Sequence, residues 1–269
     1  MLNAHSKTAL ITGASFGIGL ELARVFAREG YNLVLVARSG DKLRLLASEL
    51  EKAHGTRSLI LAVDLTDPGA PAYVLDQTTR ADIQVDVLVN NAGFGQYGLF
   101  AENDLEDCLR QIQLNVTTLT HLTRLYLPEM IERAKTEPKS GGILNVASTA
   151  GFQPGPLMAV YFATKAYVLH FSEALANELD GSGVTVTALC PGATATEFHK
   201  RANATGMNLL KFGAMDARTV AEDGYRALMA GKPVVISGFK NWLLAQSVRF
   251  SPRRLVTAIA RKTQEAGSR

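Results

Sequence analysis

Short runs of leucine and β-branched residues alternate along this chain with longer segments of helical periodicity, and this alternation restricts the fold more than any other feature. The runs are continuously apolar, which is typical of parallel strands covered by helices on both faces. Repeated strand–helix–strand units build a doubly wound α/β sheet, and we expect one with seven parallel strands. The strand candidates lie at 9–12, 32–38, 58–63, 85–90, 142–147, 184–190 and 234–237. The helix candidates lie at 18–29, 41–54, 68–81, 104–135, 159–180 and 216–230.

The length of 269 residues is that of a single domain with a sizeable core. No low-complexity linker divides the chain, and its Gly/Pro-rich stretches lie at strand ends, where such sheets place their ligand loops. Residues 193–215 are loop-like and form a candidate lid. We therefore expect one domain at 1–239, including this loop, followed by a basic amphipathic tail at 240–269.

Composition excludes several classes of protein. With 47% hydrophobic and 20% charged residues, the chain is neither disordered nor fibrous, and no apolar run reaches the roughly 18 residues of a membrane-spanning helix. The polar start leads directly into an apolar strand and leaves no room for a signal peptide, so we expect a cytoplasmic protein. The two cysteines, Cys108 and Cys190, are too few for a secreted disulfide framework and are expected as buried thiols.

The formal net charge of +3 is unevenly distributed along the chain. Residues 240–269 contain seven Lys/Arg and one Glu, a net +6, so the other 239 residues carry −3, which argues against nucleic-acid binding by the body of the protein. From Trp242 onward the tail mixes apolar and cationic residues with helical periodicity. We expect it to pack on its own domain or on a neighbouring subunit, and weak contact with an anionic membrane surface is the alternative.

A glycine-rich turn follows the first strand candidate and precedes the first helix candidate. Its spacing is G-x-x-x-G-x-G. Glycines permit a tight turn and a close approach of the backbone to a ligand, and the next helix presents free N–H groups to a pyrophosphate. The sequence therefore predicts a nucleotide-binding loop; a turn without a ligand is the alternative. The expected cofactor contacts are Gly13, Ser15, Phe16, Gly17, Ile18 and Gly19.

The second strand candidate ends at Arg38 and Ser39, where a dinucleotide fold recognises the adenosine ribose. An acidic residue at this place binds a 2′-hydroxyl, whereas arginine accommodates a 2′-phosphate through charge-assisted hydrogen bonds. The sequence thus favours NADP(H) over NAD(H) as cofactor. The alternative is a solvated arginine at the start of the next helix.

Two more strand ends supply candidate cofactor contacts. Asp64 and Leu65 close the third strand candidate, and Asp64 can bind the adenine edge or can cap a helix. Asn91, Ala92 and Gly93 follow the fourth, where small residues let a cofactor lie against the backbone. A simple asparagine-rich turn is the alternative for this second group.

Tyr161 and Lys165 are four residues apart on a predicted helix, so their side chains share one face, and Ser148 ends a strand 13 residues before Tyr161. A free tyrosine has a pKa of about 10, and a neighbouring lysine cation lowers that pKa towards the range that a general acid/base needs. Ser148 can then hold the substrate oxygen against the phenol. Tyrosine beside lysine is also ordinary helix surface, but the combination with Ser148 and the glycine loop favours catalysis.

Together these motifs resemble the short-chain dehydrogenase/reductase family over about residues 7–239. T-G-x-x-x-G-x-G stands at 12–19, N-N-A-G at 90–93 and Y-x-x-x-K at 161–165, with Ser148 at the position of the catalytic serine. The resemblance implies a Rossmann fold and a homodimer or homotetramer built from the helices at 104–135 and 159–180. The wider pattern is similar to bacterial members of broad or unassigned carbonyl specificity and to the hydroxysteroid and long-chain ketoacyl reductase branch.

The resemblance also implies a mechanism, in which a hydride passes between the nicotinamide and a carbonyl carbon while Tyr161 gives a proton to the oxygen. Lys165 would bind the ribose hydroxyls and lower the pKa of Tyr161. Asn115, at the position of the catalytic asparagine, would hold a relay water through its backbone carbonyl. Further cofactor contacts are expected after the sixth strand, at Pro191, Gly192, Thr194 and Thr196.

Large apolar residues gather in segments that such a fold sends to its ligand crevice, and an apolar pocket follows if half of them face inward. We therefore expect a hydrophobic ketone or aldehyde as substrate; ordinary core or interface packing is the alternative. The candidates are Phe94, Phe152, Met158, Phe198, Met207, Leu209 and Phe212. No histidine or cysteine spacing suits a metal, and none is expected.

Two other functions share this fold. A catalytically silent NADP(H) sensor would have no need of Ser148, Tyr161 and Lys165. A sugar-nucleotide epimerase would need a larger substrate domain than the roughly 75 residues that follow Gly192. The sequence favours an NADPH-dependent carbonyl reductase over both.

Overall fold

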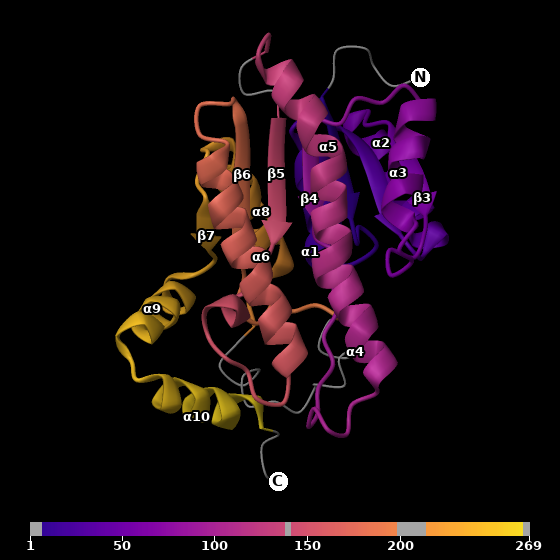
Figure 1. The fold of residues 1–269 in the computed structure, drawn as a ribbon. Helices are drawn as coiled ribbons and strands as arrows, with labels where there is room; N and C mark the ends of the chain where they lie inside the picture. The colour runs from indigo at the N-terminus through magenta and orange to yellow at the C-terminus, as the bar shows by residue number, and fades with distance from the viewer. Residues whose placement is uncertain (1–6, 138–140, 198–213, 266–269) are drawn as a thin grey trace.

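A computed structural model describes residues 7–137, 141–197 and 214–265. Its centre is a seven-stranded parallel sheet of order β3-β2-β1-β4-β5-β6-β7, as Figure 1 shows, so the predicted doubly wound α/β fold is confirmed. The strands are β1 (Thr8–Thr12), β2 (Asn32–Ala37), β3 (Ser58–Ala62), β4 (Val87–Asn90), β5 (Gly141–Val146), β6 (Val184–Cys190) and β7 (Val234–Ile236). Each begins and ends within two residues of its predicted bounds.

The strand order reverses beside β1, which pairs with β2 on one side and with β4 on the other. All residues of β1, β2, β4 and β5 are buried, which explains their uninterrupted apolar sequences. In an open parallel sheet, the carboxyl ends on either side of such a reversal diverge and leave a crevice for a ligand. The topology therefore places the ligand site at the ends of β1 and β4.

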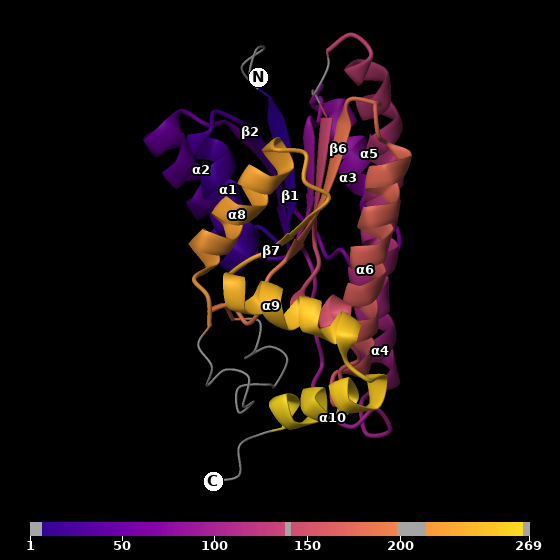
Figure 2. The ribbon, with the colours of Figure 1, turned by 90° about the vertical axis from the view of Figure 1, so that its left-hand side faces the viewer.

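Helices cover both faces of the sheet (Figure 2). One face carries α1 (Gly17–Arg28), α2 (Gly40–His54) and α8 (Ala217–Met229). The other carries α3 (Ala70–Arg80), α5 (Leu119–Ala134) and α6 (Ala159–Glu178). Each layer encloses its own apolar cluster, so the sheet separates two cores.

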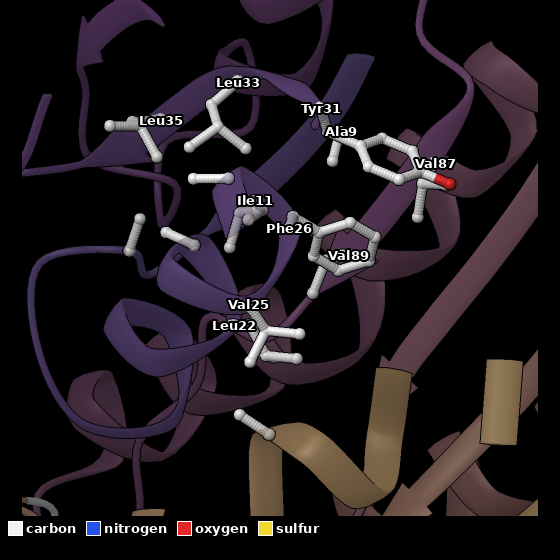
Figure 3. Close-up of a cluster of buried hydrophobic side chains, with 14 of the residues drawn as sticks. Ala9, Ile11, Leu22, Val25, Phe26, Tyr31, Leu33, Leu35, Val87 and Val89 are labelled. Carbon is white, nitrogen blue, oxygen red and sulfur yellow. The ribbon is translucent and has the colours of Figure 1, made fainter. Parts of the chain in front are cut away.

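Phe26 of α1 centres the first of these cores and is fully buried between the helix and strands β1, β2 and β4 (Figure 3). Its ring packs edge-on against Tyr31 and Tyr225 at centroid distances of 5.1 Å each. Burial of one such aromatic side chain contributes about 3 kcal/mol to stability. This packing fixes the helix that follows the glycine-rich turn.

The helix expected at 104–135 is continuous but not uniform. It consists of α4 (Leu105–Ile112), a π-helical segment η1 (Gln113–Thr118) and α5. Single π turns widen a helix and are frequent at functional sites. Asn115 lies inside this segment, a local feature that the apolar periodicity does not reveal.

The segment expected as one amphipathic tail forms two helices in the structure, α9 (Phe239–Ser247) and α10 (Arg253–Gln264), joined by a short 3-10 turn η4 (Val248–Phe250). Ala245 of α9 and the α10 residues Val256 and Ala260 are buried. Figures 1 and 2 both place α10 across the carboxyl edge of the sheet. No helix among the described residues is long and apolar enough to cross a membrane.

Candidate active site

The loop after β1 is held by contacts that leave no room for larger side chains. The Gly13 N–H donates to the Val36 carbonyl at 2.8 Å, and the Asn91 amide donates to the Thr12 carbonyl at 2.9 Å. Gly13 adopts φ +68°, and a Cβ at Gly19 would lie 2.4 Å from the carbonyl oxygen of Gly13. Gly19 thus serves the close packing of loop and helix and lines neither of the two cavities described below.

Thr12 connects the ends of β1 and β4 and was missed by the sequence analysis as a positioning residue. Its hydroxyl donates to the Val89 carbonyl at 3.1 Å and accepts from the N–H groups of Asn91 and Ala92 at 2.9 and 3.0 Å. These bonds fix the backbone of the predicted cofactor contacts after β4. The threonine that opens the glycine motif was the available signal.

A cavity of about 600 Å³, the cofactor groove, extends from the glycine loop over the ends of β2 and β3. Arg38 approaches Asp64 to 3.9 Å at its wall and remains 60% exposed, so its guanidinium is accessible to a ligand. The Asp64 carboxylate accepts hydrogen bonds from the Thr66 N–H and hydroxyl. The predicted contacts that line this groove are Gly13, Ser15, Phe16, Arg38, Ser39, Asp64, Leu65, Ala92 and Gly93.

The protonation state of Asp64 at neutral pH follows from these contacts. Burial raises its pKa, but the two hydrogen bonds from Thr66, with the charge of Arg38, outweigh burial and lower the pKa overall. Asp64 is therefore a carboxylate at neutral pH and stabilises the turn after β3. It stands beside the guanidinium that we expect to bind phosphate.

A second cavity of about 190 Å³, the catalytic cavity, adjoins the groove at the glycine loop. It brings together side chains that are up to 251 positions apart, from Gly13 to Gln264. The predicted residues that line it are Gly13, Phe16, Gly17, Ile18, Asn91, Ala92, Gly93, Ser148, Met158, Tyr161, Lys165, Pro191, Gly192, Thr194 and Thr196.

Ser148 and Tyr161 form the reactive end of this cavity. Ser148 lies in extended backbone just after β5, and its hydroxyl oxygen accepts from the Ala150 N–H at 3.1 Å. The same hydroxyl reaches the Pro191 carbonyl at 3.4 Å, and Ser148 is also hydrogen-bonded to Tyr161. The strand end and the first turn of α6 thus hold the two hydroxyl groups together.

Lys165 is buried one turn after Tyr161, and its ammonium donates to the Val146 carbonyl at 2.7 Å. Burial lowers the pKa of Lys165 to about 8. Burial also raises the pKa of Tyr161 to about 12, although its hydrogen bond with Ser148 acts in the opposite direction. The lysine nitrogen lies 5.8 Å from the centre of the tyrosine ring. In the protein chain alone desolvation therefore dominates the pKa of Tyr161, and the expectation that Lys165 lowers it beside an oxidised nicotinamide stays a prediction.

Asn115 holds two elements of the site together through its side chain. The amide donates to the Phe94 carbonyl at 2.9 Å and to the Thr164 hydroxyl at 3.0 Å, and the amide oxygen accepts from the Phe94 N–H at 3.1 Å. These bonds clamp the segment after β4 against α6. The side chain of Asn115 is thus structural, and only its backbone is left for the role that the resemblance implies.

Leu157 is a further residue that the sequence did not single out. It adopts φ +69°, a left-handed conformation that is rare outside glycine, and its carbonyl accepts from the Gly98 N–H at 2.9 Å. Met158, the next residue, is the N-cap of α6 and lines the catalytic cavity. The strained turn therefore sets the start of the helix that carries Tyr161.

Two expected pocket residues lie elsewhere. Phe94 lines the cofactor groove, because Asn115 binds its backbone at the groove's wall. Phe152 is partly buried against the apolar cluster that includes Val168 and Leu169 and lines neither cavity. The other four aromatic and aliphatic candidates, Phe198, Met207, Leu209 and Phe212, lie outside the described residues.

Thr263 and Gln264 line the catalytic cavity from the far end of the chain, and the sequence analysis did not anticipate them. The only feature of the sequence that pointed to this segment was the helical periodicity of the tail. Both cysteines are buried and free, as expected. Among the described residues, no group of three His, Cys, Asp or Glu side chains is placed to hold a metal ion.

One crevice brings together a glycine loop, an asparagine segment at a strand end and the side chains of Ser148, Tyr161 and Lys165. Comparison with known families gives the same assignment as this arrangement. A family model described as short chain dehydrogenase matches residues 7–206. The chain belongs to this family. The glycine loop, Ser148, Tyr161 and Lys165 all fall within the matched residues of this short-chain dehydrogenase.

Similar proteins include enzymes of long-chain and bulky substrates. The very-long-chain 3-oxoacyl-CoA reductase of Bos taurus is 36% identical over 197 residues, which are 71% of this chain and 61% of that reductase, so the chain spans less than two thirds of its relative's length. A short-chain dehydrogenase from Sphingobium yanoikuyae in complex with NADPH superposes with a TM-score of 0.79 at 36% identity, covering 91% of this chain and 94% of the other. The bulky-bulky ketone specific alcohol dehydrogenase from Comamonas testosteroni superposes with a TM-score of 0.75 at 32% identity, covering 91% and 92%.

Proposed function

We propose that this short-chain dehydrogenase is an NADP(H)-dependent oxidoreductase that interconverts a hydrophobic ketone or aldehyde and its alcohol. The observation that carries the proposal is the convergence of Ser148, Tyr161 and Lys165 with the glycine loop in one cavity. The cavity opens beside a groove of the size and position that a dinucleotide requires at the β1/β4 reversal.

Two glycines that line the catalytic cavity leave no room for a side chain, which keeps the backbone close to any ligand bound there. A Cβ at Gly17 would contact Thr196 at 2.9 Å, and a Cβ at Gly93 would contact Asn115 at 3.0 Å. The exposed Arg38 and the absence of an acidic residue at positions 38 and 39 favour a 2′-phosphate. The NADPH bound to the Sphingobium yanoikuyae relative supports the same choice.

The bound nicotinamide would supply or accept the hydride. Tyr161 gives the proton to the substrate oxygen; burial raises its pKa to about 12, so in the protein chain alone the phenol carries its proton at neutral pH. Ser148 holds the substrate oxygen against the phenol. Lys165, anchored on the Val146 carbonyl, lines the catalytic cavity and keeps further N–H donors for a ligand there.

The substrate class follows from the walls of the catalytic cavity. Met158 and Phe162 are buried side chains that line it, together with Ala150 and Ile18. An apolar wall of this kind favours hydrophobic groups on the carbonyl carbon. The ketone specificity named for the Comamonas testosteroni relative and the ketoacyl chemistry named for the Bos taurus relative agree with such a substrate.

The test is the loss of NADPH absorbance with a panel of aromatic, aliphatic and steroid-like carbonyls. Tyr161→Phe should reduce kcat by at least about 10³-fold, as expected for a general acid, while NADPH still quenches or shifts protein fluorescence. Tyr167→Phe is the matched control, because Tyr167 lies on the same helix, is 39% exposed and bonds Thr120 rather than the cavity. Turnover that survives Tyr161→Phe contradicts the proposal, and tight NADPH binding without turnover of any carbonyl favours the sensor.

We also propose a homodimer or homotetramer built on α4 and α6. Leu105 and Leu109 of α4 are 67% and 55% exposed, and Tyr167 of α6 lies exposed on the neighbouring helix. Exposed apolar side chains grouped on adjacent helices are typical of subunit interfaces. Leu109→Asp should lower the molar mass measured by light scattering, whereas Leu45→Asp on α2, a residue 73% exposed, should leave it unchanged.

A further inference from the structure

The end of α10 lines one side of the catalytic cavity. Figures 1 and 2 show α10 crossing the carboxyl edge of the sheet, next to the start of α6 that carries Tyr161. Thr263 and Gln264, at the end of α10, line the same cavity as Tyr161 and Ser148. A substrate that fills the cavity must therefore touch this helix.

The buried face of α10 changes character along its length. Val256, Ala260 and Gln264 are four residues apart, so they form one stripe on the helix. They are 7%, 2% and 3% exposed. The first two are apolar and secure the helix by packing. Gln264 continues the stripe to the wall of the cavity, and its side chain ends in a primary amide.

The amide oxygen of Gln264 is buried and has no hydrogen-bond partner among the described residues. A buried polar atom without a partner is unfavourable, and a leucine of similar size would occupy the same place without that loss. Gln111 is also buried with unpaired amide atoms, but it lines neither cavity, so no ligand can satisfy it there. Gln264 differs because a ligand in the cavity can supply the missing donor.

We infer that Gln264 is a specificity-determining residue whose amide oxygen accepts a hydrogen bond from a hydroxyl group of the substrate, away from the carbonyl that Tyr161 protonates. This inference rests on the proposed reductase function. It narrows the substrate class from hydrophobic ketones to hydrophobic ketones that carry a hydroxyl group. Sites built to bind a hydroxyl discriminate strongly against an analogue that lacks it, because their own polar group is then left unpaired.

The experiment compares ketones of equal size that differ only in the donor. The probes are the meta- and para-hydroxyacetophenones and the corresponding methylacetophenones, and the readout is the ratio of kcat/KM for hydroxyl over methyl. The unsubstituted protein should prefer the better-placed hydroxyl by about tenfold, the value of one neutral hydrogen bond. Gln264→Leu should bring that ratio close to one, because kcat/KM for the hydroxyl ketone falls relative to kcat/KM for the methyl ketone.

Three controls separate recognition from stability. Gln264→Leu should keep or raise the melting temperature, since it removes an unpaired buried oxygen. Gln246→Leu makes the same change at a partly exposed position of α9 and should leave the ratio as it is in the unsubstituted protein. The rise in melting temperature produced by each ketone in the presence of NADP⁺ reports binding without turnover.

The outcomes distinguish the inference from the function on which it rests. A ratio near one in the unsubstituted protein, or a preference that survives Gln264→Leu, overturns the role of Gln264 while turnover of the methyl ketones keeps the reductase proposal. If no ketone is turned over, the proposed function fails. The inference then falls as well unless the hydroxyl ketones raise the melting temperature more than the methyl ketones and Gln264→Leu removes that difference.

Discussion

The cofactor groove and the C-terminal cover, residues 239–264 with α9 and α10, bound the same active site but are built differently. The glycine loop at the start of the groove is fixed by backbone packing, because Gly13 lies so close to Gly19 and Asn91 that their atoms determine one another's positions. The cover consists of two helices that are held by buried side chains such as Val256 and Ala260, and its α10 lines the cavity with Thr263 and Gln264. Where backbone atoms pack this closely, only glycine fits. Where a helix contributes side chains to a cavity wall, many residue types can take the same position.

This difference matters for function because the groove and the cover meet different parts of the reaction. The groove is expected to hold the cofactor, and the cover lines the catalytic cavity, where the proposed substrate would lie. Substitutions in the groove should therefore affect every substrate equally. Substitutions in the cover should change the choice among substrates.

Gly19→Ala tests the groove and should have the largest effect. The new Cβ would lie 2.4 Å from both the Gly13 carbonyl oxygen and the Asn91 amide, and the backbone oxygen has no room to move. We expect NADPH affinity to fall on the order of 100-fold, in line with an overpacking cost of about 3 kcal/mol. The measurement is NADPH titration by fluorescence, with thermal unfolding as a check on folding.

The matched control is Gly69→Ala. The nearest neighbour of a Cβ at this position is an Asp67 side-chain oxygen at 3.4 Å, an ordinary contact distance. It should bind NADPH normally. Equal affinities of the two variants would show that the loop can rearrange, and the contrast between a rigid groove and an adaptable cover would then be lost.

Arg38→Asp sharpens the contrast within the groove by changing a side chain instead of the backbone. The loss of a charge-assisted contact to a 2′-phosphate should weaken NADPH binding by about 10- to 100-fold, and NADH binding should hold or improve. The ratio of the two dissociation constants is the measurement. Arg80→Asp, at a 75% exposed side chain on α3, is the control for added negative charge. An unchanged ratio places the ribose site elsewhere.

The sequence predicted the groove well because backbone conformation there depends on residue type. Glycines are required where φ is positive, as at Gly13 and Gly17, and the strands are marked by continuous apolar runs. The catalytic set was recognisable because Tyr161 and Lys165 must share a helix face. Spacing alone could not give the pKa of Tyr161, which depends on burial by residues distant in sequence.

The cover was predictable only as an amphipathic segment. Periodicity indicates that a helix has an apolar face, but it does not tell which part of the fold that face meets. Gln264 therefore gave no sign of lining the cavity, and Phe152, which looked like a pocket residue, packs partly buried against a core cluster instead. The π turn at Asn115 was likewise invisible, since its extra residue leaves the apolar pattern nearly intact.

Lys165 lies where the groove and the catalytic cavity meet, and its buried charge should appear in the pH dependence of stability. Its pKa is lowered to about 8 in the folded protein, so between pH 8 and 10 the unfolded chain binds more protons and stability rises with pH. The pKa of Tyr161 is raised to about 12, which acts in the opposite direction but only above pH 10. Between pH 8 and 10 the free energy of unfolding of the unsubstituted protein should therefore rise by up to about 2 kcal/mol relative to that of Lys165→Met.

Urea unfolding at several pH values measures this difference in the free energy of unfolding. Lys232→Met, at a lysine exposed to solvent, should follow the unsubstituted protein at each pH. A flat difference between the unsubstituted protein and Lys165→Met would mean that the ammonium is hydrated in the folded state, and the site would be more open than its burial indicates.

Ala260→Glu tests the cover and should have the smallest effect on the cofactor. Ala260 is 2% exposed on the inner face of α10, and a carboxylate there has no partner, so the helix should move away instead of burying the charge. Because α10 is secured by few contacts, its displacement should raise the KM for ketones several-fold and blunt the preference for hydroxyl groups, while the NADPH dissociation constant changes by less than about twofold. Ala258→Glu adds the same charge to an exposed position of the same helix and should change none of these values. If NADPH binding weakens together with ketone binding in Ala260→Glu, groove and cover act as one unit, and the specificity of this enzyme is inseparable from its cofactor binding.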